Sequence, residues 1–324
     1  MEYGKVPWSD KRISRVLQGT IMLSTDDLEG GFALLDAAWA TGVNAFDCAA
    51  LYGGGSCERV LGQWMEARGN RDECFVLGKS AHHNADRRRV TPWDITADIH
   101  DSLARQRTTY QDLHCLHRDD PEVEVGPIVD ILNEHLDAGR IRAFGGSNWS
   151  TARLEEANEY AAKNGLAGFV ASSPNYSLAN EIEVPWEGCL SISGPGRAAD
   201  REWYAGRRMP LFTWSSIARG FFTGKLTRAN FEAIRDDVDQ SMVTSYCYEE
   251  NFQRLDRVEE LAADRGITVA QVALAWVLQD PDLDVYALVG ARAPEETAAN
   301  AQVFEIELTP AERQWLNLER DSRD

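Results

Sequence analysis

The sequence predicts a (β/α)8 barrel, the TIM-barrel architecture, and three observations support that prediction. Eight short β-prone runs alternate with segments of helical apolar periodicity. The alternation fills most of the 324 residues, which is a typical size for such a barrel. The first run leads into Gly19-Thr20-Ile21-Met22 and lacks the G-x-G-x-x-G of a doubly wound sheet. The doubly wound alternative, which has the same alternation, is therefore disfavoured.

Each predicted strand ends in small or polar residues, and a helical pattern follows it. The predicted strands are residues 15–19, 45–47, 74–79, 112–117, 143–147, 169–172, 211–214 and 285–290. Between them, apolar residues recur at three- and four-residue spacing. Those in the first four stripes are Leu28, Ala33, Leu34, Ala37 and Ala38; Val60, Leu61 and Trp64; Ile128, Ile131, Leu132 and Leu136; and Leu154, Ala157 and Ala161. Asp94 and Thr151 are the predicted helix N-caps.

Two connections, residues 178–209 and 221–251, are long and rich in polar residues, glycine or proline. They follow the sixth and seventh predicted strands. Loops of this length in a compact domain are usually lids or binding loops. Because barrel strands are needed on both sides of each, neither is predicted to be an interdomain linker. Residues 1–324 are therefore predicted to form a single barrel domain.

Charge and composition narrow the classes of partner. The formal net charge is -19, so a phosphate backbone would repel the protein and nucleic acid is not expected as a partner. The six cysteines lack C-x-x-C spacing, which disfavours a zinc ribbon or a redox motif. No apolar signal segment begins the chain and no apolar run reaches 18 residues, so we expect a cytoplasmic location and no membrane partner. Composition leaves a homo-oligomer open.

Four polar residues with complementary chemistry fall at consecutive strand ends. Asp47, Lys79 and His117 end the second, third and fourth predicted strands, and Tyr52 follows the second in Leu51-Tyr52-Gly53-Gly54-Gly55. Catalytic residues of a TIM barrel lie at the carboxyl ends of its strands. A free phenol has a pKa near 10, and a nearby ammonium lowers it. Lys79 can act on Tyr52 in this way while Asp47 holds Lys79, and His117 can orient a carbonyl. The set predicts proton transfer coupled to hydride transfer, with Tyr52 as the proton donor.

Ordered motifs along most of the chain resemble the aldo-keto reductase family. Phe46-Asp47-Cys48-Ala49-Ala50-Leu51-Tyr52-Gly53, followed by Glu58-Arg59-Val60-Leu61-Gly62, is similar to the family's F-D-T-A-x-x-Y-G and S-E-x-x-L-G runs. Five later segments also resemble family motifs: Leu77-Gly78-Lys79; Asp112-Leu113-His114-Cys115-Leu116-His117; Ile141-Arg142-Ala143-Phe144-Gly145-Gly146-Ser147-Asn148-Trp149; Trp214 through Lys225; and Val289-Gly290-Ala291-Arg292 with Asn300.

The resemblance implies a (β/α)8 barrel that reversibly reduces an aldehyde, ketone or sugar carbonyl with a nicotinamide cofactor. It implies Tyr52 as general acid–base, Lys79 as its partner, Asp47 as the residue that orients Lys79, and His117 against the substrate oxygen. The residues that it places at the cofactor are Gly19, Thr20, Asp47, Ser147, Asn148, Ser173, Trp214, Ser215, Ile217, Arg219, Gly220, Lys225, Gly290, Arg292, Glu296 and Asn300. Met22 and Trp149 are the expected substrate contacts, and Trp8, Trp149 and Trp214 are candidates to line the mouth.

The resemblance favours NADP(H), with NAD(H) as the alternative. Ser173 lies where many members carry a Gln, and Glu296 lies where an Arg or Gln often meets the adenosine phosphate or adenine. A carboxylate there would repel a 2′-phosphate, whereas the Arg292 guanidinium suits one. The two residues therefore point in opposite directions on cofactor choice.

Several patterns have simpler interpretations. His114 and His117 lie three apart on a strand and face opposite sides, so they cannot share a metal, and no metal is expected. His82 and His83 are expected to be a solvated loop pair, and Arg87-Arg88-Arg89 a solvated charge cluster. Two rival functions remain. One is a cofactor-sensing regulatory subunit with slow turnover, and the other is an isomerase or aldolase that uses Lys79 as a Schiff base.

Overall fold

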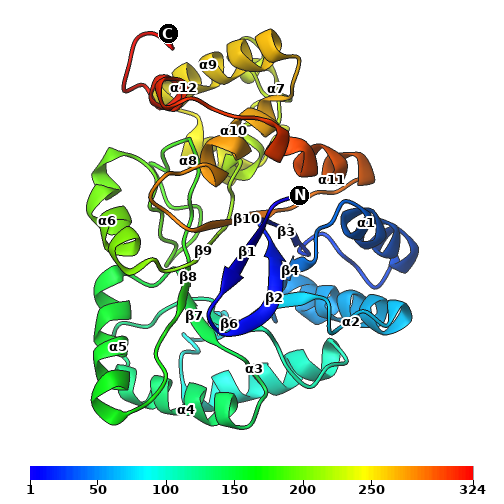
Figure 1. The fold of residues 1–324 in the computed structure, drawn as a ribbon, viewed down its shortest axis with the longest axis vertical. Coiled ribbons are helices and arrows are strands. Elements are labelled where there is room, and N and C mark those ends of the chain that lie inside the picture. Colours follow the sequence, from blue (N-terminus) through cyan, green and yellow to red (C-terminus); the bar gives the residue numbers. More distant parts are fainter. Residues whose placement is uncertain (324) are drawn as a thin grey trace.

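The computed structural model describes residues 1–323, and its centre is a closed barrel of eight parallel strands (Figure 1). The strands follow one another around the barrel in chain order, with β10 closing onto β3. They are β3 (Val16–Gly19), β4 (Ala45–Asp47), β5 (Phe75–Ser80), β6 (Leu113–Leu116), β7 (Phe144–Ser147), β8 (Ala171–Ser173), β9 (Leu211–Thr213) and β10 (Val285–Val289). The predicted barrel is thus confirmed, and each predicted strand overlaps an observed one.

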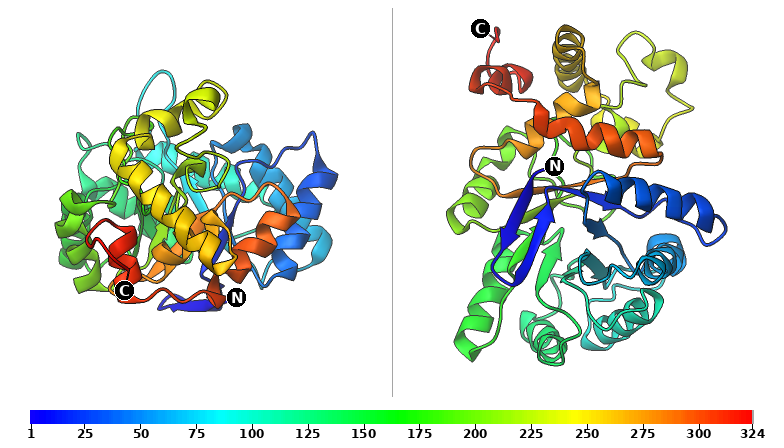
Figure 2. Two further views of the ribbon diagram at one scale, coloured as in Figure 1. Left: turned by 90° about the horizontal axis from the view of Figure 1, so that it is seen from above. Right: turned by 45° about the vertical axis from the view of Figure 1, so that its right-hand side comes forward.

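An N-terminal hairpin, which the sequence patterns did not predict, lies across one end of the barrel. Strands β1 (Tyr3–Val6) and β2 (Ser9–Ser14) pair antiparallel, and Figure 1 shows the hairpin across the centre of the ring of strands. Val6 and Ile13 are buried in one cluster with side chains of the barrel interior, among them Phe75. Figure 2 places the hairpin opposite the long connection after β9. Its position at the amino-terminal end leaves the carboxyl ends of the strands for ligand binding.

Helices surround the barrel and follow its strands in turn. The helices after the first six barrel strands are α1 (Leu28–Ala40), α2 (Ser56–Arg68), α3 (Pro92–Arg105), α4 (Val125–Asp137), α5 (Thr151–Asn164) and α6 (Ala198–Arg207). The helices after β9 are α7 (Phe231–Ile234), α8 (Gln240–Tyr246), α9 (Glu249–Arg265) and α10 (Val269–Leu278). Those after β10 are α11 (Pro294–Ala301) and α12 (Pro310–Leu316), and the 3-10 turns are η1 (Tyr52–Gly55), η2 (Pro195–Arg197), η3 (Ala218–Gly220) and η4 (Gln302–Glu305).

Both predicted N-caps are wrong. Thr91 caps α3 by accepting a hydrogen bond from the Asp94 backbone N–H, which puts Asp94 inside the first turn. Ser150 caps α5 by accepting from the Arg153 N–H, so Thr151 is the first helical residue. Neighbouring Ser, Thr and Asp residues have similar capping preferences, and only the backbone conformation selects among them.

The two long connections contain helices and are not pure loops. The connection after β8 includes η2 and α6, which is the helix of that barrel repeat, and the connection after β9 includes η3, α7 and α8. Close to the site they remain irregular: the segment between Leu178 and Gly194 has no helix. The prediction of long connections after the sixth and seventh barrel strands is confirmed, but their description as loops is wrong.

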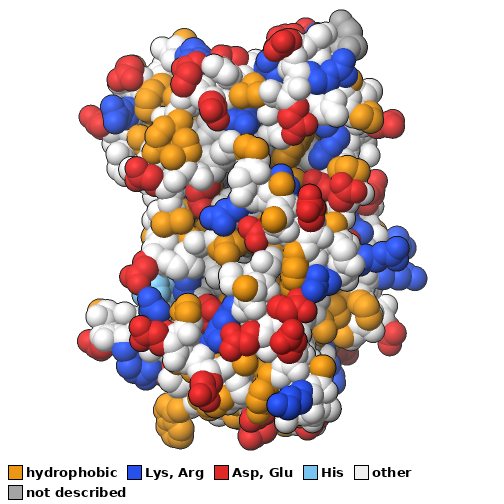
Figure 3. Space-filling model, turned by 90° about the vertical axis from the view of Figure 1, so that its left-hand side faces the viewer, with side chains coloured by type: hydrophobic (Ala, Val, Ile, Leu, Met, Phe, Trp, Pro, Cys, Tyr) orange, Lys and Arg blue, Asp and Glu red, His pale blue; other side chains and the backbone are white. Residues whose placement is uncertain are grey.

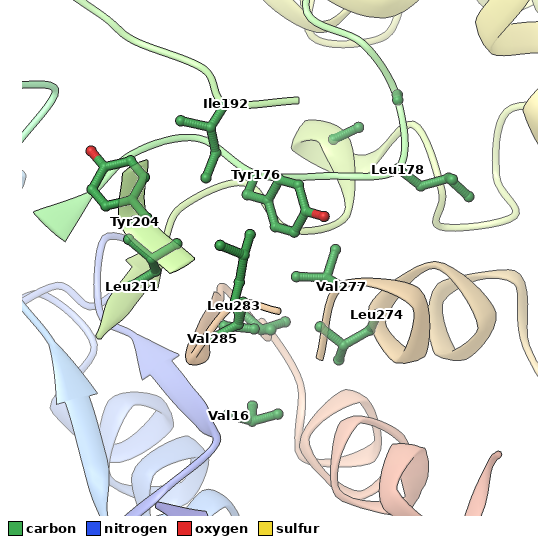
Figure 4. Close-up of a cluster of buried hydrophobic side chains, with 14 of the residues drawn as sticks. Val16, Tyr176, Leu178, Ile192, Tyr204, Leu211, Leu274, Val277, Leu283 and Val285 are labelled. Carbon is green, nitrogen blue, oxygen red and sulfur yellow. The ribbon is translucent and has the colours of Figure 1, made fainter. Parts of the chain in front are cut away.

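The largest apolar cluster lies between the barrel and its helices. Figure 4 shows Leu211 and Val285 of the barrel facing Leu274 and Val277 of α10, with Tyr176 nearby. Leu34, Val60, Ile128 and Leu154 from the predicted helix stripes are all buried. The apolar periodicity therefore marks the faces that hold the helices against the strands.

The surface carries charges of both signs. On the face drawn in Figure 3, acidic and basic side chains are interspersed. Within residues 1–323, no helix by itself combines the length and apolar composition of a membrane span. The consecutive helices α9 and α10 meet that test only as a pair, and they are bent by 106° at their junction.

Candidate active site

The barrel brings Asp47, Tyr52, Lys79 and His117 together at the carboxyl ends of β4, β5 and β6. Lys79 forms a buried ion pair with Asp47. The Lys79 ammonium lies 5.4 Å from the centre of the Tyr52 ring. On the other side of Tyr52, the His117 ring meets it edge-on, with ring centres 5.8 Å apart. The predicted grouping is thus present, since adjacent parallel strands place their ends side by side.

Three consecutive glycines shape the turn that presents Tyr52. Gly53, Gly54 and Gly55 all have positive φ, at 55°, 60° and 87°. Residues with a side chain rarely adopt this left-handed backbone conformation, so the turn depends on glycine. The Tyr52 N–H donates to the Ala49 carbonyl at 3.1 Å, which anchors the turn just beyond β4.

Burial dominates the acidity of Tyr52. It raises the pKa of Tyr52 to about 12, while the Lys79 charge opposes that rise and Asp47 adds to it. The expectation that Lys79 brings the Tyr52 pKa below 10 is therefore wrong for the protein alone, although the direction of the Lys79 effect is right. For Lys79 itself, burial lowers the pKa, but Asp47 and Tyr52 more than compensate and raise it. Lys79 is accordingly an ammonium and Tyr52 a neutral phenol at neutral pH.

His117 is a neutral imidazole with a free nitrogen. Burial, together with the charges of Lys79 and Arg118, lowers its pKa well below the usual value. Its Nδ1 is buried without a hydrogen-bond partner among the described residues. The His82 ring packs edge-on to His117 at 5.0 Å and contacts His83 at 4.2 Å. The expectation that His82 and His83 are a solvated pair is therefore wrong, because both are part-buried and His82 packs against His117.

His114 lies on the other side of its strand, as predicted. Its ring nitrogens lie 2.7 Å from Ser80 Oγ and 2.6 Å from Gln111 Oε1. It is completely buried and separate from the Tyr52 cluster. The Arg87–Arg89 cluster is also structural, since its guanidiniums pair with acidic side chains, namely Asp94, Asp98, Asp120 and Glu187.

Ser147, Asn148, Ser173 and Trp214 form a hydrogen-bonded group beside the cluster. Ser147 Oγ donates to the Ser173 carbonyl at 3.0 Å. Asn148 Nδ2 donates to Ser147 Oγ and to the His117 carbonyl, and Asn148 Oδ1 accepts from Trp214 Nε1 at 3.2 Å. Asn148 thereby joins the indole to the backbone of His117, just beyond β6. Ser173 Oγ is buried and has no partner among the described residues.

Unusual backbone conformations cluster at this end of the barrel. Ala81, Asn148 and Ser215, which follow β5, β7 and β9, have positive φ of 59°, 61° and 53°. Ala218 and Arg219 in η3 have φ of 51° and 54°. Strained residues of this kind concentrate at ligand-binding sites, where the surrounding structure holds them.

The segment after β9 carries the predicted pyrophosphate contacts. Arg219 donates to Asp239 at 2.5 Å and lies 4.1 Å above the Trp186 ring, and its Nε is buried without a partner among residues 1–323. Ser215, Ile217 and Gly220 are partly exposed, and Lys225 is exposed. The residues expected at the adenosine end lie farther along the chain: Gly290, Arg292 and Glu296 are exposed and Asn300 is part-buried.

Burial corrects two predicted contacts, and position in the barrel corrects a third. Trp149 is fully buried, lies 4.7 Å from Phe169 and donates to the Arg118 carbonyl, so it is a core residue and cannot line the mouth. Thr20 is also fully buried, and its hydroxyl donates to the Asp47 carbonyl at 2.9 Å, so its side chain is not available to a cofactor. Trp8 lies in the β1–β2 turn, at the opposite end of the barrel.

Gly19 and Met22 lie at the end of β3 and just beyond it. Met22 is part-buried, and its methyl group would lie 3.2 Å from a Cβ on Gly290. Gly19 is buried at the end of β3. Arg118, by contrast, was not predicted. Its signal in the sequence is a basic residue directly after His117.

The residues present fit a nicotinamide cofactor. His117 Nδ1, Ser173 Oγ and Arg219 Nε are buried polar atoms without protein partners, and buried polar atoms normally have one. They lie in the segments where the substrate oxygen, the carboxamide and the pyrophosphate are expected. The strained backbone around η3 also belongs to this group of segments. A bound cofactor and substrate would supply the missing partners.

Comparison with known proteins decides the family. The model of the Aldo/keto reductase family matches residues 17–317. The chain belongs to this family. It is 27% identical to Aldo-keto reductase YhdN of Bacillus subtilis, over 98% of this chain and 93% of that one. It is 25% identical to a probable voltage-gated potassium channel subunit beta of Oryza sativa, over 94% and 92%. Among solved structures, an aldo-keto reductase from Klebsiella pneumoniae in complex with NADPH superposes with a TM-score of 0.69 at 23% identity, over 96% of this chain and 94% of that one.

Proposed function

We propose that this aldo-keto reductase interconverts a carbonyl compound and its alcohol with NADP(H), and that Tyr52 exchanges the proton. The observation that carries the proposal is the cluster itself: a phenol between a buried ammonium and a neutral imidazole, at the carboxyl end of a barrel. Tyr52, Lys79, Asp47 and His117 would together form the catalytic set. Family membership supports hydride transfer to or from a nicotinamide.

The cofactor supplies or accepts the hydride, and the residues of this chain manage the proton and the substrate oxygen. Neutral His117 is suited to hydrogen bond the carbonyl oxygen without competing for its proton. Tyr52 is protonated at neutral pH, because burial raises its pKa to about 12, so it can donate a proton as negative charge develops on that oxygen. Lys79 stabilises the phenolate that remains, and Asp47 holds Lys79 charged.

The cofactor residues would act in three groups. Ser147, Asn148 and Ser173 would hold the carboxamide, and Trp214 would stack on the nicotinamide ring. The segment from Ser215 to Lys225 would contact the pyrophosphate, with Arg219 as its main cation. Arg292, Glu296 and Asn300 would meet the adenosine. The NADPH complex of the Klebsiella pneumoniae structure supports NADP(H). Glu296 favours NAD(H) instead, and its carboxylate accepts a hydrogen bond from the Arg292 N–H at 2.8 Å.

A cofactor-sensing regulatory subunit is the second candidate. The observation that favours it is the similarity to the potassium channel subunit beta of Oryza sativa. Such a subunit would bind the cofactor tightly and turn over slowly. The Schiff-base alternative is disfavoured, because a Lys79 held as an ammonium by Asp47 is not a nucleophile.

The test is turnover of a carbonyl panel with NADPH and NADH, by the wild type and by Tyr52→Phe. The wild type is expected to reduce at least one aldehyde. Tyr52→Phe is expected to lose on the order of 10²- to 10⁴-fold in turnover while its cofactor fluorescence titration stays unchanged. Full activity of Tyr52→Phe would refute the proton-donor role. Tight cofactor binding without turnover of any carbonyl would favour the regulatory subunit.

A further inference from the structure

Arg118 is a buried arginine at the edge of the catalytic cluster. It follows His117 directly and is only 7% exposed. Its charge acts on the His117 and His82 imidazoles, lowering the pKa of each, and it interacts with Tyr52. Of the three rings that it influences, His117 contacts both of the others at the barrel mouth. Arg118 therefore belongs to the region where the reacting carbonyl is expected.

All the hydrogen-bond partners of Arg118 are uncharged. Its guanidinium donates to the Glu187 carbonyl at 3.2 Å, to the His117 carbonyl at 2.8 Å and to Cys189 Sγ at 3.3 Å. A guanidinium has five N–H donors, so these three bonds leave two of them without an acceptor in the described part of the chain. A sulfur is moreover a weak acceptor.

The carboxylates of Asp119 and Asp120, which follow Arg118 directly, and of Glu187, whose carbonyl accepts from it, are engaged by other arginines. Asp119 pairs with Arg153, and both Asp120 and Glu187 pair with Arg88. No carboxylate within residues 1–323 forms an ion pair with Arg118. Its two ionisable neighbours do not supply the charge either. Burial raises the pKa of Cys189 to about 11 and that of Tyr52 to about 12, so both are neutral at pH 7.

Burying a cation without an anion costs free energy, and most buried cations in proteins are paired. We infer that Arg118 binds a carboxylate of the substrate, and that the substrate class is carbonyl compounds bearing such a group. The inference rests on the proposed reductase function. Guanidinium and carboxylate match in geometry, and the two remaining N–H donors suit an acceptor-rich group.

The charge count at the mouth favours a carboxylate over a phosphate. Lys79 is neutralised by Asp47. His82 and His117 carry no charge at neutral pH, because burial lowers the pKa of His82 to about 4 and that of His117 further. Arg118 thus contributes the one unpaired positive charge of this cluster, which balances a monoanion. The exposed Trp186, next to Glu187 in the same segment, offers an apolar surface for the body of such a substrate.

The test compares two aldehydes that differ in charge, 4-carboxybenzaldehyde and its methyl ester. In the wild type, kcat/KM should be higher for the acid. In Arg118→Gln, kcat/KM for the acid should fall by about tenfold or more, mainly through KM, while that for the ester falls much less. Arg118→Lys keeps the positive charge but cannot form two parallel hydrogen bonds to a carboxylate. It should therefore recover only part of the loss.

Arg88→Gln is the matched control. Arg88 is 46% exposed and also contacts Glu187, so the substitution removes a positive charge and one tie to the same segment. It should leave the preference for the acid in place. Equal losses on acid and ester in Arg118→Gln would mean that Arg118 only supports the 187–189 segment, and the inference would be overturned. A wild type without preference for the acid would overturn it too.

Calorimetric titration with the product 4-(hydroxymethyl)benzoate separates this inference from the proposed function. Binding to the wild type that is lost in Arg118→Gln, without turnover of either aldehyde, would support the carboxylate site and refute the reductase. Turnover of the ester, with product binding that does not depend on Arg118, would support the reductase and refute the carboxylate site.

Discussion

Replacing Lys79 by methionine should separate its electrostatic role from its structural one. The Lys79 ammonium lies 5.4 Å from the centre of the Tyr52 ring. At an effective dielectric constant of about 20, a charge pair at that separation interacts by about 3 kcal/mol. Since one pKa unit corresponds to about 1.4 kcal/mol, the Tyr52 pKa should rise by about two units in Lys79→Met. Asp47, left buried without its cation, should take up a proton and add no charge of its own.

The two reaction directions share one transition state, so at a given pH they should respond alike to that change. Alcohol oxidation requires the Tyr52 phenolate, so its kcat/KM should rise about tenfold per pH unit between about pH 7 and 10, where Tyr52 with a pKa of about 12 is mostly protonated. In Lys79→Met this rate should fall about 100-fold at each pH, because the phenolate fraction falls with the two-unit rise in pKa. Carbonyl reduction passes through the same transition state, so with unchanged cofactor affinities its kcat/KM at the same pH should fall by about the same factor.

The assay is kcat/KM in both directions from pH 6 to 10, for the wild type, Lys79→Met and Lys79→Arg. Lys79→Arg keeps a positive charge and should retain a larger share of the oxidation rate. Thermal unfolding by circular dichroism identifies variants that do not fold. A folded Lys79→Met that keeps the wild-type kcat/KM would refute the electrostatic reasoning and leave Lys79 a structural role.

Three further predictions concern stability and cofactor choice. Burial lowers the pKa of His114 to about 3, so the unfolded chain takes up the extra proton first as pH falls. Between pH 6.5 and 4.5 the free energy of unfolding should therefore drop by about 2 kcal/mol, and His114→Asn should lose this pH dependence in urea titrations at a series of pH values. Gly62→Ala places a Cβ 2.5 Å from the backbone of Gln106, just after α3, and should lower the free energy of unfolding by about 1–3 kcal/mol. Gly206→Ala, whose Cβ meets nothing within 4 Å, should not lower it. Glu296→Gln should raise the ratio of NADPH affinity to NADH affinity by a factor on the order of three to ten in fluorescence titrations. An equal effect of Glu295→Gln would show that only the overall charge of the protein matters.

Local sequence patterns determined most of the architecture. The alternation of β-prone and helical segments predicted all eight barrel strands, because strand and helix periodicities are properties of short segments. The hairpin was not predicted, since its strand Ser9–Ser14 contains Asp10, Lys11 and Arg12. Its apolar contacts come from Val6 and Ile13, which pack into the barrel. Packing partners distant in the chain leave no periodic signal in the segment itself.

The grouping of Asp47, Tyr52, Lys79 and His117 also followed from the sequence, because neighbouring parallel strands necessarily end side by side. Only the tertiary structure decided how those groups behave. Burial sets the Tyr52 pKa above that of a free phenol, moves Trp149 into the core, and leaves Arg118 beside the cluster with uncharged partners. Solvent exclusion and charge pairing depend on every element packed around a side chain, and therefore on contacts that no single stretch of sequence contains.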